Sequence, residues 1–249
     1  MGVFYEMTCR VGAADAGIYT QCRPSGVLNL LQEAATEAAC AFHASGPEML
    51  EKYNALWMVT RMWYRLDRPL LWNQQVTIRT WHRADRGAML YRDFDLFVDG
   101  EPVGEAVSAW VLADADSRRL LKMSTVEDVM RTGGGELCKQ RKLAKVRMPE
   151  DMILAEERRF HYSDIDCNGH VNNVRYADLA ADAAGLETAL ADRFVSSLQI
   201  GYLKECMAGE SLLVYVGGDT KERFVHGVSP AGESRFDAIL TLDEWGEKG

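Results

Sequence analysis

The order of predicted elements occurs twice along the chain, and this duplication constrains the fold more than any other feature. Residues 25–42 place Leu28, Leu31 and Ala35 at helical spacing and predict a long buried helix. Runs rich in β-branched and aromatic residues follow and predict strands at 57–69, 74–83, 88–98 and 103–114. The opening residues, MGVFYEMTCRV, predict one more strand.

The second half repeats this plan with little sequence identity. Residues 158–166 predict a strand, 171–185 a helix, and 193–206, 211–218, 221–230 and 234–243 four more strands. A shift of 146 residues aligns Val174 with Leu28 and Tyr176 with Leu30. Two copies with so long a period indicate two related modules rather than a solenoid. We expect an α+β fold in which each module wraps one antiparallel sheet around its helix.

The duplication predicts an N-terminal module at 1–132, a basic linker at 133–150 and a C-terminal module at 151–249. The linker begins in the flexible TGGGE, and its basic run KQRKLAKVRMPED, from Lys139 onward, has no acidic residue until Glu150. Such a run is either a solvated connector or a docking surface for an acidic partner. Its basic residues are Lys139, Arg141, Lys142, Lys145 and Arg147.

Composition excludes several classes of protein. A formal net charge of -9 argues against general affinity for nucleic acid. Six scattered cysteines without CxxC pairs indicate a reducing compartment, and we expect the cytoplasm. No apolar run approaches the length of a bilayer span, so we expect neither secretion nor membrane insertion.

The stretch DCNGHVNN at 166–173 stands just before the second predicted helix and permits three interpretations. Asp166, Asn168 or Asn172 could cap the helix, but a cap needs only one such side chain. A metal site would need further ligands at suitable spacing, and none accompanies Asp166 and His170, so we expect no metal. In a catalytic interpretation, Asp166, Asn168 and His170 form one polar row in extended backbone that enters a helix N-terminus.

A helix N-terminus of this kind is suited to acyl transfer. Its free amides can stabilise a developing oxyanion, while an imidazole and a carboxylate position or deprotonate water. The duplication provides an internal control, because the first module has Thr20, Cys22 and Pro24 at the three matching positions. A cap demanded by the fold would be needed equally in both modules. This asymmetry favours a catalytic function.

These motifs resemble the acyl-acyl carrier protein thioesterases of the hotdog superfamily, over nearly the whole chain. In the second half the resemblance rests on DIDCNGHVNNVRYADLA and on GYLKEC. In the first half it rests on LLQEAATEAA, WMVTRMWYRLDRPLLW and VSAWVLADADSRRLLKM. DIDCNGHVNN alone indicates only the superfamily, whereas the GYLKEC block and the two-module length are similar to the family itself.

The resemblance implies an active site formed by Asp166, Asn168, His170 and Glu205, with Cys206 as a rival nucleophile. A thiol is a good leaving group, so a thioester needs mainly an activated water and an oxyanion hole. We favour Glu205 with His170 as the group that activates water, with Asn168 orienting and Asp166 holding the loop. In the alternative, Cys206 attacks with His170 as base. In an extended strand neighbouring residues face opposite sides, so either the Glu205 carboxylate or the Cys206 thiol should reach His170, but not both.

For the first module the resemblance implies an acyl-chain pocket between helix and sheet. Candidate lining residues are Leu28, Leu31, Trp57, Met58 and Met62. On the sequence alone, ordinary core accounts for each of them better than a pocket does, because any packed helix or strand shows an apolar face.

The expected reaction is hydrolysis of a fatty acyl thioester on acyl carrier protein, without a cofactor. An acyl-CoA thioesterase, a non-catalytic acyl-thioester sensor and a hotdog dehydratase are the alternatives. Acyl carrier protein is acidic, so either the linker or Arg83, Arg86 and Arg92 should dock it. A tandem pair already buries what two single modules bury by dimerising, so both a monomer and a homodimer fit the sequence.

Overall fold

The computed structural model describes residues 4–83, 89–126 and 143–245. The chain divides into two compact units, each formed from separated parts of the sequence. The first comprises residues 1–10, 29–64 and 75–143, and the second comprises 11–28, 65–74 and 144–249. Residues 133–142, more than half of the expected basic linker, lie outside the described residues.

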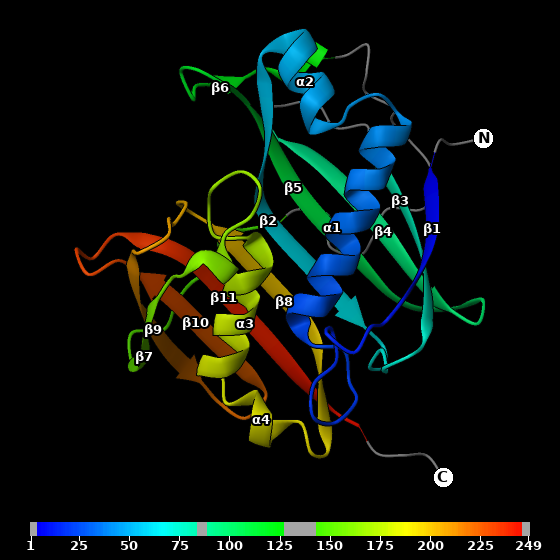
Figure 1. The fold of residues 1–249 in the computed structure, drawn as a ribbon. Helices are drawn as coiled ribbons and strands as arrows, with labels where there is room; N and C mark the ends of the chain where they lie inside the picture. The colour runs from blue at the N-terminus through cyan, green and yellow to red at the C-terminus, as the bar shows by residue number, and fades with distance from the viewer. Residues whose placement is uncertain (1–3, 84–88, 127–142, 246–249) are drawn as a thin grey trace. The chain divides into compact units, whose positions relative to one another are not determined.

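The sheet of the first unit has the order β1, β3, β4, β5, β2. Its strands are β1 (Tyr5–Arg10), β2 (Ala55–Leu66), β3 (Gln75–His82), β4 (Leu90–Val98) and β5 (Glu101–Asp114), with the short β6 (Leu120–Leu121) on β5. β1, β3, β4 and β5 pair antiparallel, as their meander order predicts. Helix α1 (Pro24–Ala41) lies across this sheet in Figure 1.

Helix α1 confirms the helix expected at 25–42, to within one residue at each end. The side chains of Leu28, Leu31, Ala34 and Ala38 are fully buried, because they recur on one face at helical spacing. A second helix, α2 (Gly46–Tyr53), and the 3-10 turn η1 (Met123–Val126) complete the first unit. α2 was not expected, because eight residues give too short a pattern to read.

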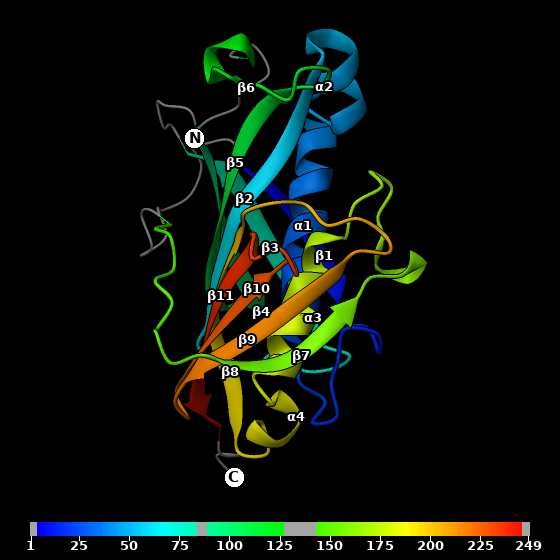
Figure 2. The ribbon, with the colours of Figure 1, turned by 90° about the vertical axis from the view of Figure 1, so that its left-hand side faces the viewer.

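The second unit repeats the arrangement with the strand order β8, β11, β10, β9, β7. Its strands are β7 (Ile153–Arg159), β8 (Arg193–Tyr202), β9 (Ser211–Gly218), β10 (Glu222–Val228) and β11 (Ser234–Glu244), all antiparallel to their neighbours. Helix α3 (Asn173–Ala183) covers one face of this sheet, and the short α4 (Leu186–Ala189) follows it. In Figure 2 the strands β7 and β9 of this sheet cross the view in front of α3.

The core of the second unit lies between α3 and the sheet. Tyr176 of α3 stands at its centre, with ring centroids 6.1 Å from Phe160, 5.9 Å from Tyr202 and 5.3 Å from Phe236. Opposite Phe236 on β10 is Gly227, where a Cβ would approach the Phe236 ring to 2.3 Å. Glycine is therefore required at 227 so that the aromatic ring can pack inward.

Two segments differ from their expected structure, and both flank the polar motif. The strand expected at 158–166 ends at Arg159, and a 3-10 turn, η2 (Tyr162–Asp164), follows. The strand expected at 193–206 ends at Tyr202, so residues 203–206 are not extended sheet. Each unit consists of a long helix on an antiparallel sheet, and the chain has the expected α+β double hotdog fold.

Candidate active site

Residues 165–171 form a tight turn between η2 and α3. The amide of Asp166 donates to the carbonyl of His170 at 2.9 Å, and an isolated bridge joins Ile165 to Val171. Gly169 has φ of 83°, a conformation that only glycine adopts without strain. The expectation of one polar row in extended backbone is therefore wrong, since Asp166 and His170 lie across a turn instead.

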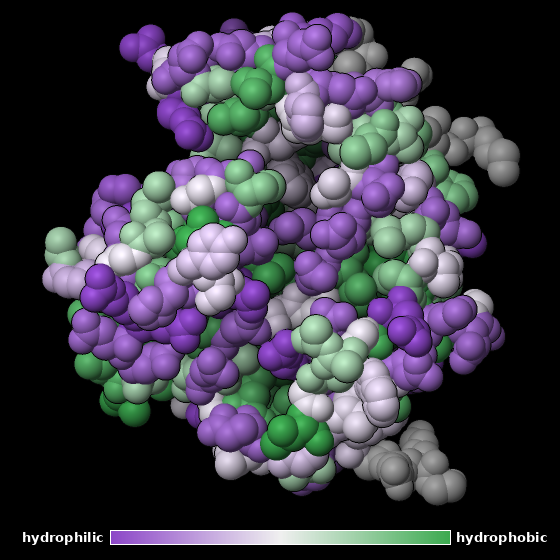
Figure 3. All heavy atoms as spheres, in the orientation of Figure 1, coloured by the Kyte–Doolittle hydropathy of each residue, from purple (hydrophilic) through white to green (hydrophobic). Residues whose placement is uncertain are grey.

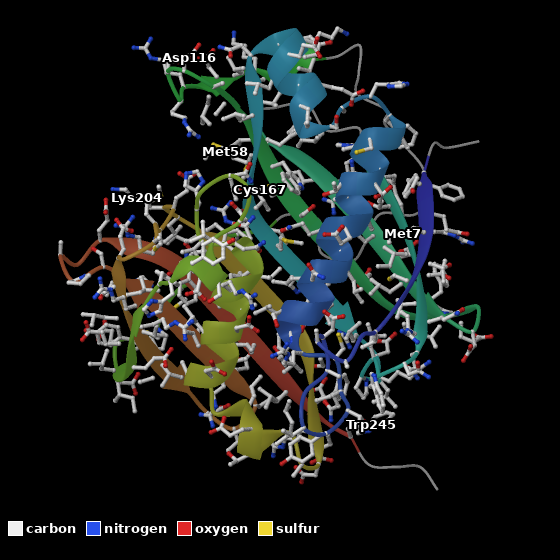
Figure 4. The ribbon with its side chains drawn as sticks, viewed as in Figure 1. Met7, Met58, Asp116, Cys167, Lys204 and Trp245 are labelled. Atoms are coloured by element: carbon white, nitrogen blue, oxygen red, sulfur yellow. The ribbon has the colours of Figure 1, made fainter. Side chains whose placement is uncertain are left out.

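The Asp166 carboxylate stabilises this turn. Its Oδ1 accepts a hydrogen bond from the amide of Asn168 at 2.8 Å, while its carbonyl accepts one from the amide of Gly169 at 3.0 Å. This is an Asx-type turn, in which a short polar side chain replaces a backbone partner. The Asn168 side chain is exposed, and within the described residues no hydrogen bond joins it to His170. Cys167, labelled in Figure 4, lies at the exposed tip.

Asn172 connects this turn to the helix. Its side-chain oxygen accepts from the amide of Val174 at 3.0 Å, which makes it the N-cap of α3. Its own amide donates to the carbonyl of Asp164 at 2.9 Å. Asp164 is buried and accepts from Arg158 at 2.9 Å and from the amide of His161 at 2.8 Å. The helix cap of the first interpretation is therefore present. Asn172 alone, of the three candidates, provides it.

Glu205 reaches His170 from the segment that follows β8. The distance between His170 Nε2 and Glu205 Oε2 is 3.2 Å, and their side chains are 20% and 45% exposed. The two segments are joined by a hydrogen bond of 2.9 Å from the amide of Val171 to the carbonyl of Cys206. Figure 4 shows Lys204, which marks the Glu205 segment, beside the loop that carries Cys167. The imidazole and the carboxylate thus lie at contact distance, and solvent can reach both groups.

Cys206 lies on the other side of the same segment. It is only 1% exposed, and burial raises the pKa of its thiol. Its amide donates to Tyr176 Oη at 3.2 Å, so the helix holds this residue through main-chain contacts. Burial also raises the pKa of the Tyr176 hydroxyl, which stays protonated. The described contacts of Cys206 are those of a packed residue.

Tyr176 and Arg235 are the two residues that the sequence did not assign to this site. Tyr176 could have been found from its place one turn into α3, on the same face as the helix start. No motif in the sequence near Arg235 indicates that it belongs to the site. Its Nη1 donates to the carbonyl of Glu205 at 2.6 Å, a contact that depends on long-range pairing.

The five residues expected to line an acyl-chain pocket are placed as follows. Leu28, Leu31 and Met62 are buried, whereas Trp57 and Met58 are half-buried. Trp57 donates through Nε1 to the carbonyl of Ala44 at 2.9 Å and packs beside α2. Leu28 groups with the second unit and the other four with the first.

Two of the three arginines expected to dock an acidic partner are buried in the first unit. Arg83 makes a two-pronged ion pair with Asp93, at 2.7 and 2.6 Å. Arg92 contacts His82, and burial lowers its pKa to about 10. A docking surface formed by Arg83 and Arg92 is therefore wrong, because both side chains are buried, Arg83 against Asp93 and Arg92 against His82. Arg86 lies outside the described residues.

A small polar cavity of about 70 Å³ lies beside α3, away from Glu205. Its lining includes Arg158, Asp164, Arg175, Asp178 and Asp182. Figure 3 shows hydrophilic residues over much of the face that α3 presents. In the described residues, no group of three or more His, Cys, Asp or Glu side chains is arranged to hold a metal ion. No helix in the described ranges is long and apolar enough to span a membrane.

Comparison with known proteins adds independent findings. The model of the acyl-ACP thioesterase N-terminal domain matches residues 2–131, and that of the C-terminal domain matches residues 150–232. A palmitoyl-acyl carrier protein thioesterase (chloroplastic) of Gossypium hirsutum is 27% identical, over 99% of this chain and 62% of its own length. Oleoyl-acyl carrier protein thioesterase 1 (chloroplastic) of Arabidopsis thaliana is also 27% identical, over 99% of this chain and 74% of its own. The chain thus spans about two thirds of the length of these relatives.

Two solved structures share the fold. An acyl-ACP thioesterase from Bacteroides thetaiotaomicron superposes with a TM-score of 0.87 at 18% identity, covering 96% of this chain and 98% of that one. A 12:0-ACP thioesterase from Umbellularia californica gives a TM-score of 0.83 at 18% identity, covering 98% of each chain. At this identity the likeness concerns the fold.

Proposed function

Because the chain belongs to the acyl-ACP thioesterase family, we propose that it hydrolyses fatty acyl thioesters carried on acyl carrier protein. Water is the second substrate, and the products are a free fatty acid and the carrier thiol. The observation that carries the proposal is the 3.2 Å pair of His170 and Glu205, solvent-accessible and held by two neighbouring segments.

In the proposed mechanism the Glu205 carboxylate takes a proton from water as the water oxygen attacks the thioester carbonyl carbon. His170, whose Nε2 lies 3.2 Å from Glu205 Oε2, is assigned to orienting this carboxylate. The tetrahedral intermediate carries its charge on the former carbonyl oxygen, which the positive end of the α3 dipole stabilises. The carbon–sulfur bond then breaks, and the carrier thiolate leaves and takes up the proton that Glu205 removed from water, which restores the carboxylate. No covalent enzyme intermediate is needed, since a thiolate departs without strong acid assistance.

Asp166 and Asn168 have supporting functions in this mechanism. Asp166 fixes the turn through the Asn168 amide, and this contact sets the position of His170. The exposed Asn168 side chain is assigned to orienting the attacking water. Cys206 is assigned to packing, because it is buried while Glu205 faces solvent.

The remaining parts of the proposal concern the modules and the carrier. We assign the acyl chain to the N-terminal module at 1–132, with Leu28, Leu31, Trp57, Met58 and Met62 as its lining, and catalysis to the module at 151–249. Enlarging the half-buried Met58 to phenylalanine should then reduce turnover of the longest acyl chains only. A Met152→Phe variant, half-buried but outside both the N-terminal module and the linker, is the matched control.

The carrier is proposed to dock on the linker at 133–150, of which the exposed Lys145 and Arg147 are described. The test compares acyl-carrier-protein and acyl-CoA substrates of the same chain length. Charge reversal at Lys145 and Arg147 should raise KM for the carrier-bound substrate alone, while the exposed Lys221→Glu serves as control. Equal efficiency with both substrates, unaffected by charge reversal, would favour an acyl-CoA thioesterase.

We place the enzyme in the cytoplasm, on the basis of its scattered cysteines and the absence of CxxC pairs. Cell fractionation tests this location. Sedimentation of the purified protein distinguishes a monomer from a homodimer.

A further inference from the structure

The pairing of β10 with β11 contains a bulge at Arg235. Gly227 pairs with Phe236, but the next residue, Val228, pairs with Ser234, so Arg235 has no partner on β10. Bulges of this kind bend a strand and re-aim one side chain, and they are frequent beside active sites. Without the bulge, Arg235 would pair with a residue of β10, as its neighbours on β11 do. The bulge releases it to make other contacts.

Arg235 uses this freedom to bind three consecutive residues of the segment that carries Glu205. Its carbonyl accepts hydrogen bonds from the amides of Leu203 at 2.9 Å and Lys204 at 3.2 Å. Its guanidinium Nη1 donates to the carbonyl of Glu205 itself at 2.6 Å. These contacts replace the ladder that ends when β8 stops at Tyr202. Without them, nothing in the sheet would fix the main chain at 203–205.

The other guanidinium nitrogen joins the far end of the same segment. Nη2 lies 3.8 Å from Glu210 and 3.5 Å from Glu233. Glu210 in turn accepts from the amide of Met207 at 3.1 Å. The Arg235 side chain is only 11% exposed, so water screens these charges less than it would at the surface. One residue therefore contacts both sides of the loop at 203–210.

A buried polar chain keeps the bulge in place. Ser234 Oγ lies 3.3 Å from His226 Nε2, and His226 Nδ1 lies 2.6 Å from Asp237 Oδ1. Asp237 is 2% exposed and His226 is 23% exposed, so this pair is partly shielded from water. The chain fixes Ser234 directly before the bulge, and hence the position from which Arg235 starts.

We propose that Arg235 is a positioning residue for the reaction, which holds the Glu205 main chain so that its carboxylate meets His170. The inference rests on the proposed function, because it gives Glu205 the water-activating role. Arg235 touches neither the imidazole nor the carboxylate of the pair. Its effect acts through the Glu205 backbone, and a misplacement of about 1 Å at a catalytic group can cost about 100-fold in rate.

The test uses two substitutions and one matched control. Arg235→Met removes the guanidinium, and Arg235→Lys keeps a charge with fewer donors. Arg193 also donates a hydrogen bond to a main-chain carbonyl, that of Thr220 at 2.5 Å, but at the opposite end of β8, so Arg193→Met is the control. We expect kcat for an acyl-carrier-protein substrate to fall about 100-fold in Arg235→Met, with KM nearly unchanged, and to recover partly in Arg235→Lys.

A double-mutant cycle separates positioning from general destabilisation. If Arg235 acts through Glu205, adding Arg235→Met to Glu205→Gln causes little further loss, whereas a structural effect adds in full. Normal kcat in Arg235→Met, or full additivity in the cycle, overturns the positioning role alone. Full activity in Glu205→Gln overturns the proposed base and the positioning role with it. Should Arg235→Met fail to fold, Arg235→Lys and Ser234→Ala supply the same comparison.

Discussion

Replacing Cys206 by alanine separates the two chemical schemes for this site. Burial raises the pKa of the Cys206 thiol above its ordinary value of 9.0. The raised pKa favours the neutral thiol over the thiolate that a nucleophile requires. The main-chain hydrogen bonds of residue 206, to Val171 and Tyr176, survive the substitution, whereas the contact of its thiol with the Tyr176 hydroxyl is lost. The variant therefore loses one buried sulfur, at a cost of about 1 kcal/mol of stability.

We expect Cys206→Ala to change kcat by less than about threefold, which corresponds to about 0.7 kcal/mol in the barrier. Release of the carrier thiol, followed with a thiol-reactive dye, measures the rate, and the melting temperature reports on folding. A loss of about 1,000-fold in a well-folded variant would refute the reasoning, because only a nucleophile accounts for a barrier increase of about 4 kcal/mol.

Three further substitutions test other contacts. Tyr176→Phe leaves the buried amide of Cys206 without its acceptor, and thermal unfolding should show a loss of about 1 to 3 kcal/mol, while wild-type stability would contradict the contact. Gly169→Ala forces a side chain into φ of 83°, so we expect about 1 to 2 kcal/mol of strain and a fall in kcat, and an unchanged kcat would show that the turn does not set His170. Burial, and next the charge of Asp178, raise the pKa of Asp182 in the folded protein, so its ionised form destabilises the fold and stability is lost as pH rises through that raised pKa. Asp182→Asn should therefore raise the melting temperature at pH 8 but not at pH 3, and an equal gain at both pH values would contradict this cause.

Much of the fold could be predicted because its signals are local. Helical spacing gave α1 and α3, and β-branched runs gave the meanders, in the same order twice. The strand predictions for residues 158–166 and 203–206 are wrong for one physical reason. Their residues have strand-like composition, but distant partners decide their hydrogen bonds: Leu203 and Lys204 donate to Arg235, which no pattern near residue 203 indicates.

The residues of the candidate site likewise fall into those that a short motif indicates and those that depend on distant contacts. His170 and Asp166 could be found because they sit in one short motif. That Glu205 rather than Cys206 faces His170 depends on how the chain turns after β8, and periodicity does not specify this. Arg83 and Arg92 resembled surface charges in the sequence, yet strand register buries both, and Asp93 compensates for Arg83.

Intact-mass analysis of Glu205→Gln mixed with an acyl-carrier-protein substrate tests the central claim most directly. If Glu205 activates water for direct attack, turnover falls by about 100-fold to 10,000-fold and the protein gains no mass. His170 and Cys206 remain unaltered in this variant, so a Cys206 nucleophile would still be acylated. Accumulation of a protein heavier by one acyl group, or turnover close to that of the wild type, would contradict the account.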